Sequence, residues 1–327
     1  MALFFLITTK VTVLKTYIKY QSTVIILLIL GLVSCGKFSD GVVHEVAFPE
    51  NEPRLSATLI VNDEDEVIIT QVSATASVLD AAGPQSIPNA IISLTNESGQ
   101  TIYSLGSDNF SSMDSLYHLD LDENFGTLTG EITLAVDAPD FEIVTAKSTM
   151  PPKPSFTYTY EYRGDSTITP WGEGYEYQDK FILDLENDLT RADNYLVFVD
   201  VLFEDIVSGN SNWENQLLTY RPDNRITYNN ITNGLLISDD NTDSNSAYLS
   251  EITFFSKNFE TGLKWSPTSL RLRIQALSPE LASYYKSVDM IMGMGLDIFS
   301  EPTLVYSNLS GGFGCFGLAS ESIVIVE

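Results

Sequence analysis

The chain has 327 residues, and its 17 basic and 44 acidic side chains give a formal net charge of −27. A chain this acidic repels nucleic acid phosphates and offers no Lys/Arg cluster to neutralise them, which argues against DNA and RNA as partners. Its apolar share of 44%, with 17 Phe, 16 Tyr and 3 Trp, is enough to fill the cores of two ordinary domains.

Residues 1–35 have the parts of a bacterial lipoprotein signal peptide. Positive charge comes first, from the lysines Lys10, Lys15 and Lys19. The apolar run at 24–33 follows and is too short to span a bilayer comfortably. Leu32, Val33 and Ser34 then form a lipobox directly before Cys35. We expect cleavage before Cys35 and a diacylglycerol on its thiol; the alternatives are an uncleaved membrane anchor or an apolar strand.

Only one other cysteine, Cys315, is present, so a mature chain lipidated at Cys35 can form no intramolecular disulfide. Residues 36–53 combine small and polar residues with two prolines and show no sustained periodicity, which predicts a tether. If lipidated, the exported chain would be anchored to a membrane by its lipid. The residues directly after Cys35 leave its surface or periplasmic orientation open.

Residues 54–149 show short β-branched runs separated by turn residues. The expected strands are Leu55 to Val61, Val67 to Val72, Ala90 to Thr95, Leu116 to Leu121, Gly130 to Val136 and Phe141 to Ala146. This spacing predicts an immunoglobulin-like or prealbumin-like β-sandwich. Residues 150–154 carry three prolines, which cannot join a ladder of hydrogen bonds, and are predicted to be a linker between two domains.

Residues 155–327 predict a larger β-sheet domain with one or two short helices, so the fold class is mainly β. Its expected strands are the aromatic run from Phe156 to Tyr162, then Phe181 to Leu185, Tyr195 to Phe203, Leu217 to Tyr220, Tyr248 to Phe255, Ser269 to Leu277 and Ser322 to Val326. One helix is expected: Ser278 can cap it, Pro279 suits its first position, and apolar residues recur at helical spacing until Gly293.

Four residues fit part of a calcium-loop pattern. Asp120, Asp122, Asn124 and Glu131 stand at its first, third, fifth and twelfth positions, but the glycine is displaced to 126 and the flanks predict strands. We therefore favour a hairpin turn with acidic edges and keep calcium as the alternative. The nearby His118 is interpreted as an exposed hydrogen-bonding residue.

The glycine-rich stretch at 312–317 matches the pattern G-x-G-x-x-G. A dinucleotide site also needs a helix directly after the glycines and an acidic residue about twenty positions on. The chain ends ten residues later with a predicted strand, so we expect these glycines to allow close backbone approach or positive φ, and Cys315 among them to be a buried, inert thiol. No catalytic residue, metal ion or cofactor is predicted.

An aromatic cluster could form a ligand platform. Trp171, Tyr175 and Tyr177 follow the aromatic strand in a glycine-rich turn, where they could stack on sugars or peptides; the alternative is that they complete a core or a domain junction.

Several short motifs resemble one known family. They are Leu277-Ser278-Pro279-Glu280, Tyr284-Tyr285-Lys286, Glu301-Pro302 and Tyr306 to Gly317 near the end, and Ala57 to Asn62, Asn89 to Leu94 and Met150-Pro151-Pro152 earlier. The chain resembles Bacteroidota lipoproteins catalogued as domain of unknown function 4249, although Leu309, Phe313 and Cys315 depart from the commoner residues. The resemblance implies an outer-membrane lipoprotein typically encoded near TonB-dependent receptors, and no catalytic residues.

These observations predict a non-enzymatic, lipid-anchored outer-membrane lipoprotein that is an accessory or ligand-capturing partner of a TonB-dependent transporter. The alternative is a surface glycan- or peptide-binding module, or an adhesin, that uses the aromatic cluster. A third interpretation, an uncharacterised hydrolase, would need carboxylates alone for its chemistry.

Overall fold

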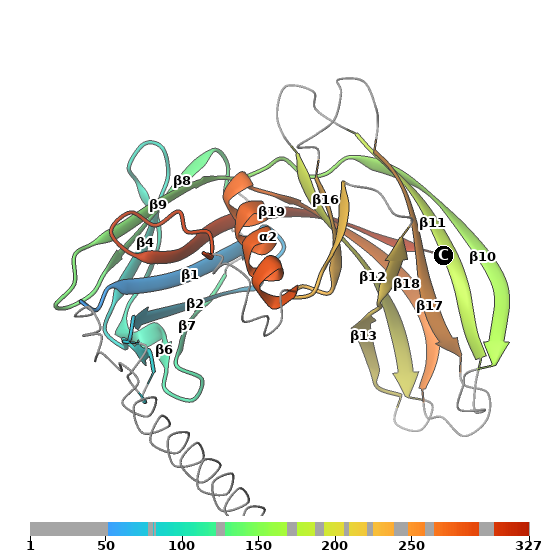
Figure 1. Cartoon of the computed structure of the whole chain (residues 1–327), viewed down its shortest axis with the longest axis horizontal. Helices are drawn as coiled ribbons and strands as arrows, with labels where there is room; N and C mark the ends of the chain where they lie inside the picture. Colours follow the sequence, from blue (N-terminus) through green and yellow to red (C-terminus); the bar gives the residue numbers. More distant parts are fainter. Residues whose placement is uncertain are drawn as a thin grey trace, which may run out of the picture. The chain divides into compact units, whose positions relative to one another are not determined.

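A computed structural model describes residues 52–77, 81, 83–121, 128–168, 175–186, 193–205, 209–220, 225–238, 248–258, 265–293 and 304–326 (Figure 1). Within these ranges the protein is mainly β, as predicted, with one α-helix, α2 (Pro279–Gly293), and one 3-10 turn (Ser107–Asn109). No helix in this described part is long and apolar enough to cross a membrane. The predicted signal peptide and tether lie outside the described residues.

The largest sheet has eleven strands and includes strands from both ends of the described chain. In spatial order they are β15 (Ile226–Asn229), β16 (Gly234–Ser238), β12 (Asn194–Asp205), β18 (Trp265–Leu277), β19 (Phe313–Val326), β1 (Leu55–Asn62), β2 (Val67–Ala74), β7 (Leu116–Asp120) and β6 (Phe110–Ser111), with β13 (Ser211–Asn215) beside β12 and β3 (Gln85–Ser86) beside β2. β19 is parallel to β1, and the other neighbours are antiparallel.

Two four-stranded sheets pack against one face of this large sheet. The first has the order β5 (Thr101–Leu105), β4 (Ile91–Thr95), β8 (Glu131–Asp137) and β9 (Val144–Thr149). The second has the order β10 (Phe156–Ile168), β11 (Tyr175–Leu185), β17 (Tyr248–Asn258) and β14 (Leu218–Tyr220). The result is two sandwiches that share one sheet.

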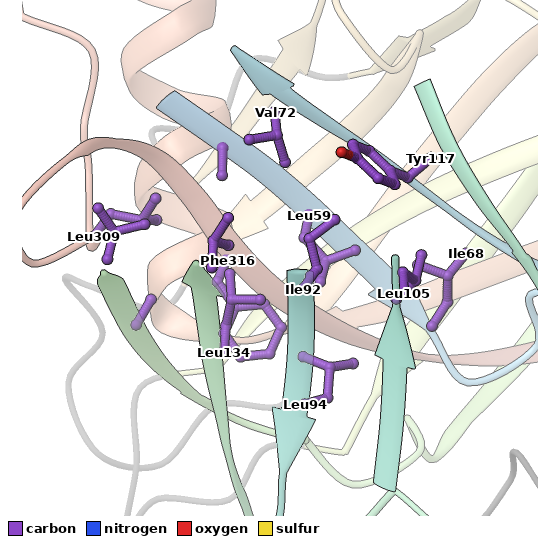
Figure 2. Packing of buried hydrophobic residues seen from close by; sticks show 14 of the residues in the cluster. Leu59, Ile68, Val72, Ile92, Leu94, Leu105, Tyr117, Leu134, Leu309 and Phe316 are labelled. Atoms are coloured by element: carbon purple, nitrogen blue, oxygen red, sulfur yellow. The ribbon is translucent and has the colours of Figure 1, made fainter. Parts of the chain in front are cut away.

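The first sandwich has a largely apolar interior. Figure 2 shows Leu59 and Phe316 of the large sheet beside Ile92 and Leu134 of the small one. β1 alternates buried and half-buried residues along most of its length, which is the period of a strand with one face on a core. The hydroxyl of Tyr117 is satisfied inside this core, because it donates to the carbonyl of Ile87 and accepts from the amide of Ala90.

The second sandwich repeats this arrangement with other strands. Phe181 and Leu183 of β11 pack with Val199 of β12, Leu272 of β18 and Val326 of β19. All five side chains are buried, and each comes from a run that the sequence predicts to be a strand. β19 therefore supplies core residues to both sandwiches.

Residues 150–154, predicted to be a linker between two domains, connect the two small sheets. The large sheet continues through both sandwiches. Residues 150–154 run without regular structure from β9 to β10. Lys153 forms ion pairs with Asp63 and Glu64, and the Ser322 hydroxyl donates to the carbonyl of Pro154 at 2.9 Å. Residues 52–327 form one compact unit, because the last strand of the chain completes the sandwich that the first strands begin.

The glycine-rich stretch is part of β19, which begins at Phe313, nine residues before the predicted start at 322. Gly314 has φ +120°, and a Cβ placed there would lie 1.9 Å from the carbonyl oxygen of Ala57. A Cβ on Gly317 would lie 2.7 Å from the Cβ of Leu281. The expectation of close approach and positive φ is confirmed, and both serve packing of the strand against β1 and α2.

The predicted helix is also confirmed, from Pro279 to Gly293. The Ser278 hydroxyl accepts a hydrogen bond from the amide of Leu281 at 3.3 Å, as an N-cap does. Leu281 and Ala282 pack on Ala319 of β19, with Ile60 of β1 against the same cluster. The helix therefore covers part of the face of the large sheet opposite the two sandwich cores.

Candidate functional site

Most of the residues predicted for lipidation and ligand stacking lie outside the described residues. These are Leu32, Val33, Ser34, Cys35 and Trp171. Tyr175 and Tyr177 belong to β11, where their backbones pair with Asn258 and Ser256 of β17, but their side chains are also outside the described set. The lipid anchor and the aromatic platform therefore stay predictions.

The hairpin turn favoured for residues 120–131 is wrong. β7, which ends at Asp120, pairs with β2 and β6, whereas β8, which begins at Glu131, pairs with β4 and β9 of another sheet. The connection thus passes from one sheet of the sandwich to the other. Alternating apolar runs predict strands but not which strand each one joins.

The calcium alternative gains no support from the described candidates. Asp122 and Asn124 lie outside them, and the Glu131 carboxylate forms an ion pair with the Lys147 ammonium at 2.6 Å. In the part of the chain that the structure describes, no group of three or more His, Cys, Asp or Glu could hold a metal ion. His118 Nε2 lies 2.8 Å from the Asp114 carboxylate, in line with its predicted hydrogen-bonding role.

Cys315 is buried, and burial together with the charge of Glu280 raises its pKa to about 12. A thiol with this pKa is almost wholly protonated at neutral pH, and the thiolate is the reactive form. The predicted burial of the thiol is confirmed, and its raised pKa is in line with the predicted inertness.

A different set of functional side chains lies on the outer face of the large sheet, which is the face opposite the sandwich cores. Along β12, Val197, Val199 and Val201 enter the second core, so Asp200 lies on the outer face. Along β18, Leu272 enters that core, which places the arginines on either side of it on the outer face with Asp200.

These arginines hold the buried carboxylate of Asp200. The Nε atoms of Arg271 and Arg273 each lie 2.6 Å from Asp200 Oδ2. Arg273 Nη1 also donates to Glu321 Oε1 at 3.0 Å. Asp200 is only 2% exposed and Glu321 5%, so both carboxylates are removed from water and paired with guanidinium groups.

Neutral side chains complete the cluster around Glu321. Gln275 donates to its Oε1 at 3.2 Å, and Asn62 donates to its Oε2 at 3.4 Å. Burial lowers the pKa of Arg273, but the hydrogen bonds and charges of Asp200 and Glu321 raise it more, so the net shift is upward. Arg273 is thereby fixed as a structural cation at the centre of the cluster.

Arg271 is placed differently from Arg273. Its guanidinium lies 4.5 Å from the centroid of the Trp213 ring, and its side chain is 26% exposed. Among the described residues only its Nε is hydrogen-bonded, which leaves Nη1 and Nη2 as donors toward solvent. Stacking on the indole and the bond to Asp200 together fix the direction of this guanidinium.

Two exposed isoleucines lie next to this arginine. In the pairing of β18 with β19, Ile325 is directly opposite Arg271 and Ile323 is directly opposite Arg273, so all four share the outer face. Ile325 is 50% exposed and Ile323 44%. Trp213, Arg271, Ile323 and Ile325 together are called the Arg271 surface below.

The chemistry that this surface offers is recognition. A guanidinium is not deprotonated in proteins, so Arg271 cannot serve as a general acid or base, but its two terminal nitrogens can bind a carboxylate bidentately. Tryptophan and arginine are also the residues most enriched at the energetic centres of protein interfaces. The arrangement therefore suits binding of an anionic group flanked by apolar surface.

Sequence reasoning identified β12, β18 and the end of β19 but neither β13 nor the charged residues of this site. The available signal was a single acid, Asp200, inside the apolar run from Tyr195 to Phe203, together with two arginines at alternate positions of the strand at 269–277. Charged residues at alternate positions of a predicted strand share a face. That face need not be solvated, because opposite charges on neighbouring strands can neutralise each other there.

Comparison with known proteins gives one family and no close relative. Residues 45–323 match the family described as Domain of unknown function (DUF4249). No curated protein matches the chain.

Solved structures are similar only at a low level. BcpA, the major pilin subunit of Bacillus cereus, has 10% sequence identity and a TM-score of 0.20 over 69% of this chain and 64% of that one. Trypsin-activated alpha-2-macroglobulin from Escherichia coli has 12% identity and a TM-score of 0.19 over 69% of this chain and 14% of that one. The chain thus spans less than two thirds of either protein, and likenesses this slight carry no argument about function.

Proposed function

The chain belongs to the family described as domain of unknown function (DUF4249), and we propose that it is a lipid-anchored outer-membrane lipoprotein and a non-enzymatic accessory or ligand-capturing partner of a TonB-dependent transporter. The observation that carries the proposal is the Arg271 surface. It presents a fixed guanidinium, an indole and two exposed isoleucines on an open sheet face, a composition typical of interfaces.

The anchor is inferred from the sequence. Leu32, Val33 and Ser34 before Cys35 form the lipobox, and a tether of about 18 residues has a root-mean-square reach of roughly 20–25 Å. The folded part would thus stay within a short distance of the membrane. Attachment by lipid confines the chain to the surface in which a transporter is embedded, which raises their effective concentration for each other.

The TonB-dependent partner is inferred from the resemblance to Bacteroidota lipoproteins, which are typically encoded near such receptors. A binding role fits the described chemistry, since the outer-face cluster consists of fixed ion pairs around Asp200 and Glu321 and a non-titrating arginine. The charge of −27 fits a soluble, solvated surface that avoids nonspecific association with nucleic acid.

The test is affinity purification of the native lipidated protein from outer membranes solubilised in mild detergent, followed by mass spectrometry. We expect a TonB-dependent receptor to be recovered in near-stoichiometric amount. The Cys35→Ala variant, which cannot be lipidated, should be released from the membrane fraction and recover much less receptor. A lipidated chain that never recovers a receptor would contradict the proposal.

A further inference from the structure

We propose that the Arg271 surface binds an extended segment of a partner protein in which a carboxylate side chain is flanked on one side by two alternate aliphatic side chains. This inference rests on the proposed function and deepens it by naming the chemistry of the partner.

The carboxylate is specified by the two terminal nitrogens of Arg271, which have no hydrogen-bond partner among the described residues. Its Nε is bonded to Asp200 at 2.6 Å and its Cζ lies over the Trp213 ring, 4.5 Å from the centroid, so these two contacts hold the direction of the remaining two donors. A planar fork of this kind matches the two oxygens of a carboxylate. Little side-chain freedom is left to lose on binding, which favours affinity.

The aliphatic flanks are specified by Ile323 and Ile325. They are two residues apart on β19, so their side chains are roughly 7 Å apart along the strand on one face. Alternate side chains of an extended peptide have the same spacing. The Arg271 guanidinium extends from β18 over Asp200 of β12 to Trp213 of β13. A peptide lying along β19 can therefore place two apolar side chains on the isoleucines while a carboxylate farther along it reaches across β18 toward Arg271.

The charge distribution favours a single carboxylate over a polyanionic surface. Asp200 and Glu321 are buried beneath the arginines, whereas the chain as a whole carries −27 and repels extended anionic surfaces. Neutral glycans would leave the Arg271 fork unpaired. They would also find one side of the Trp213 ring already covered by the guanidinium.

Two pentapeptides that differ in one group test the inference. Acetyl-Ile-Thr-Ile-Thr-Glu-amide carries the carboxylate, and acetyl-Ile-Thr-Ile-Thr-Gln-amide replaces it by a neutral amide of the same shape. Each is titrated by calorimetry into the full lipidated chain in detergent. We expect the glutamate peptide to bind at least about tenfold more tightly, because hydrogen bonds between charged partners are the stronger ones.

The variant Arg271→Gln should abolish this preference. It is expected to fold, because Asp200 keeps its bond to Arg273 at 2.6 Å. The matched control is Arg54→Gln, which removes another arginine lying over an exposed aromatic ring, 5.9 Å from the centroid of Phe313. The control should keep the tenfold preference, and thermal unfolding of both variants shows whether each is folded.

A second variant keeps the test decisive if Arg271→Gln does not fold. Ile325→Thr preserves a β-branched side chain on the strand but removes apolar surface. It should weaken binding of both peptides about fivefold and leave the ratio between them unchanged. Unaltered affinities in folded Ile325→Thr would overturn the part of the inference that concerns aliphatic flanks.

Three results would overturn the inference as a whole. They are equal affinities of the wild-type chain for the two peptides, an undiminished glutamate preference in folded Arg271→Gln, and Arg271-dependent binding to phosphatidylglycerol–phosphatidylcholine vesicles without any peptide preference. Failure of the proposed function can be distinguished from failure of this inference. A glutamate preference without receptor in the affinity purification contradicts the transporter role alone, and receptor recovery without any preference contradicts this inference alone.

Discussion

The two halves of β19 belong to one strand but have different surroundings. From Phe316 to Ala319 the strand is buried on both faces, with Phe316 and Leu318 in the first core and Ala319 under α2. Beyond Glu321, the outer-face residues Ile323 and Ile325 are exposed, on the strand next to the arginines. The first half thus stabilises the fold, and the second half offers a surface.

The two halves of β19 differ because α2 packs over the first half only. Leu281 and Ala282 lie over the glycine-rich half, where Gly317 leaves room for the helix. Beyond the helix, charge neutralisation replaces apolar cover: Glu321 of β19 pairs with Arg273 of β18. This ion-paired face leaves part of an arginine accessible to a ligand. A helix packed on the same face would cover it.

The largest expected effect is that of Gly314→Ala in the first half. The new Cβ would meet the Ala57 carbonyl at 1.9 Å in a backbone conformation with φ +120°, so β1 and β19 could not pair as they do. We expect a loss of at least about 4 kcal/mol in the free energy of unfolding, measured by urea denaturation. Gly99→Ala is the control, because its φ of +77° is also positive but nothing lies within 4 Å of the added Cβ; its cost should be about 1 kcal/mol.

Asp200→Ala should cost about 3 kcal/mol in the free energy of unfolding. It leaves Arg271 without its ion-pair partner and Arg273 with Glu321 alone, in a buried site. Asp184→Ala, at an exposed position of β11, is the matched control and should change stability by less than about 0.5 kcal/mol. A cost at Asp200 no larger than this control would show that the cluster contributes little to the fold.

Leu318→Ala and Ile325→Thr compare the two halves at apolar positions. Leu318 is fully buried, so its truncation should cost about 2–4 kcal/mol, whereas Ile325 is half exposed and its substitution should cost less than about 0.5 kcal/mol. Both values come from the same denaturation experiment. Equal costs would contradict the division of β19 into a packed and an open half.

The last expected effect is a pH dependence in the first half, which appears only in alkaline solution. Burial raises the pKa of Cys315 to about 12, above the ordinary thiol value of 9.0, so above pH 9 the unfolded chain ionises while the folded one keeps its proton. Stability should therefore be full below pH 9, fall by about 1 kcal/mol from pH 9 to 10, and level off above about pH 12. Cys315→Ala should show a shallower decline over the same interval, and an unchanged slope would contradict this assignment.

Elements with a strong local signal could be predicted from the sequence. Alternation identified β1, β2 and β8 almost to the residue, and the cap at Ser278 with the stop at Gly293 defined α2. β13 was missed because its sequence, from Ser211 to Asn215, is polar and shows no apolar alternation.

Long-range pairing could not be predicted in this way. The parallel pairing of β1 with β19 joins opposite ends of the described chain, and no local period encodes it. The candidate site also depends on long-range pairing. Asp200 and Arg271 are 71 residues apart in sequence and meet only because β12 pairs with β18. Each residue alone resembles an ordinary charged residue of a strand.

The most direct test of the functional role of the open half is receptor recovery by three forms of the lipidated chain: wild type, Arg271→Gln and Arg54→Gln. Each is purified from outer membranes in mild detergent, and the TonB-dependent receptor that accompanies it is quantified by mass spectrometry. We expect equal recovery by the wild type and Arg54→Gln, and a loss of roughly tenfold or more with folded Arg271→Gln. Equal recovery by all three forms would contradict the assignment of the Arg271 surface as the site of partner binding.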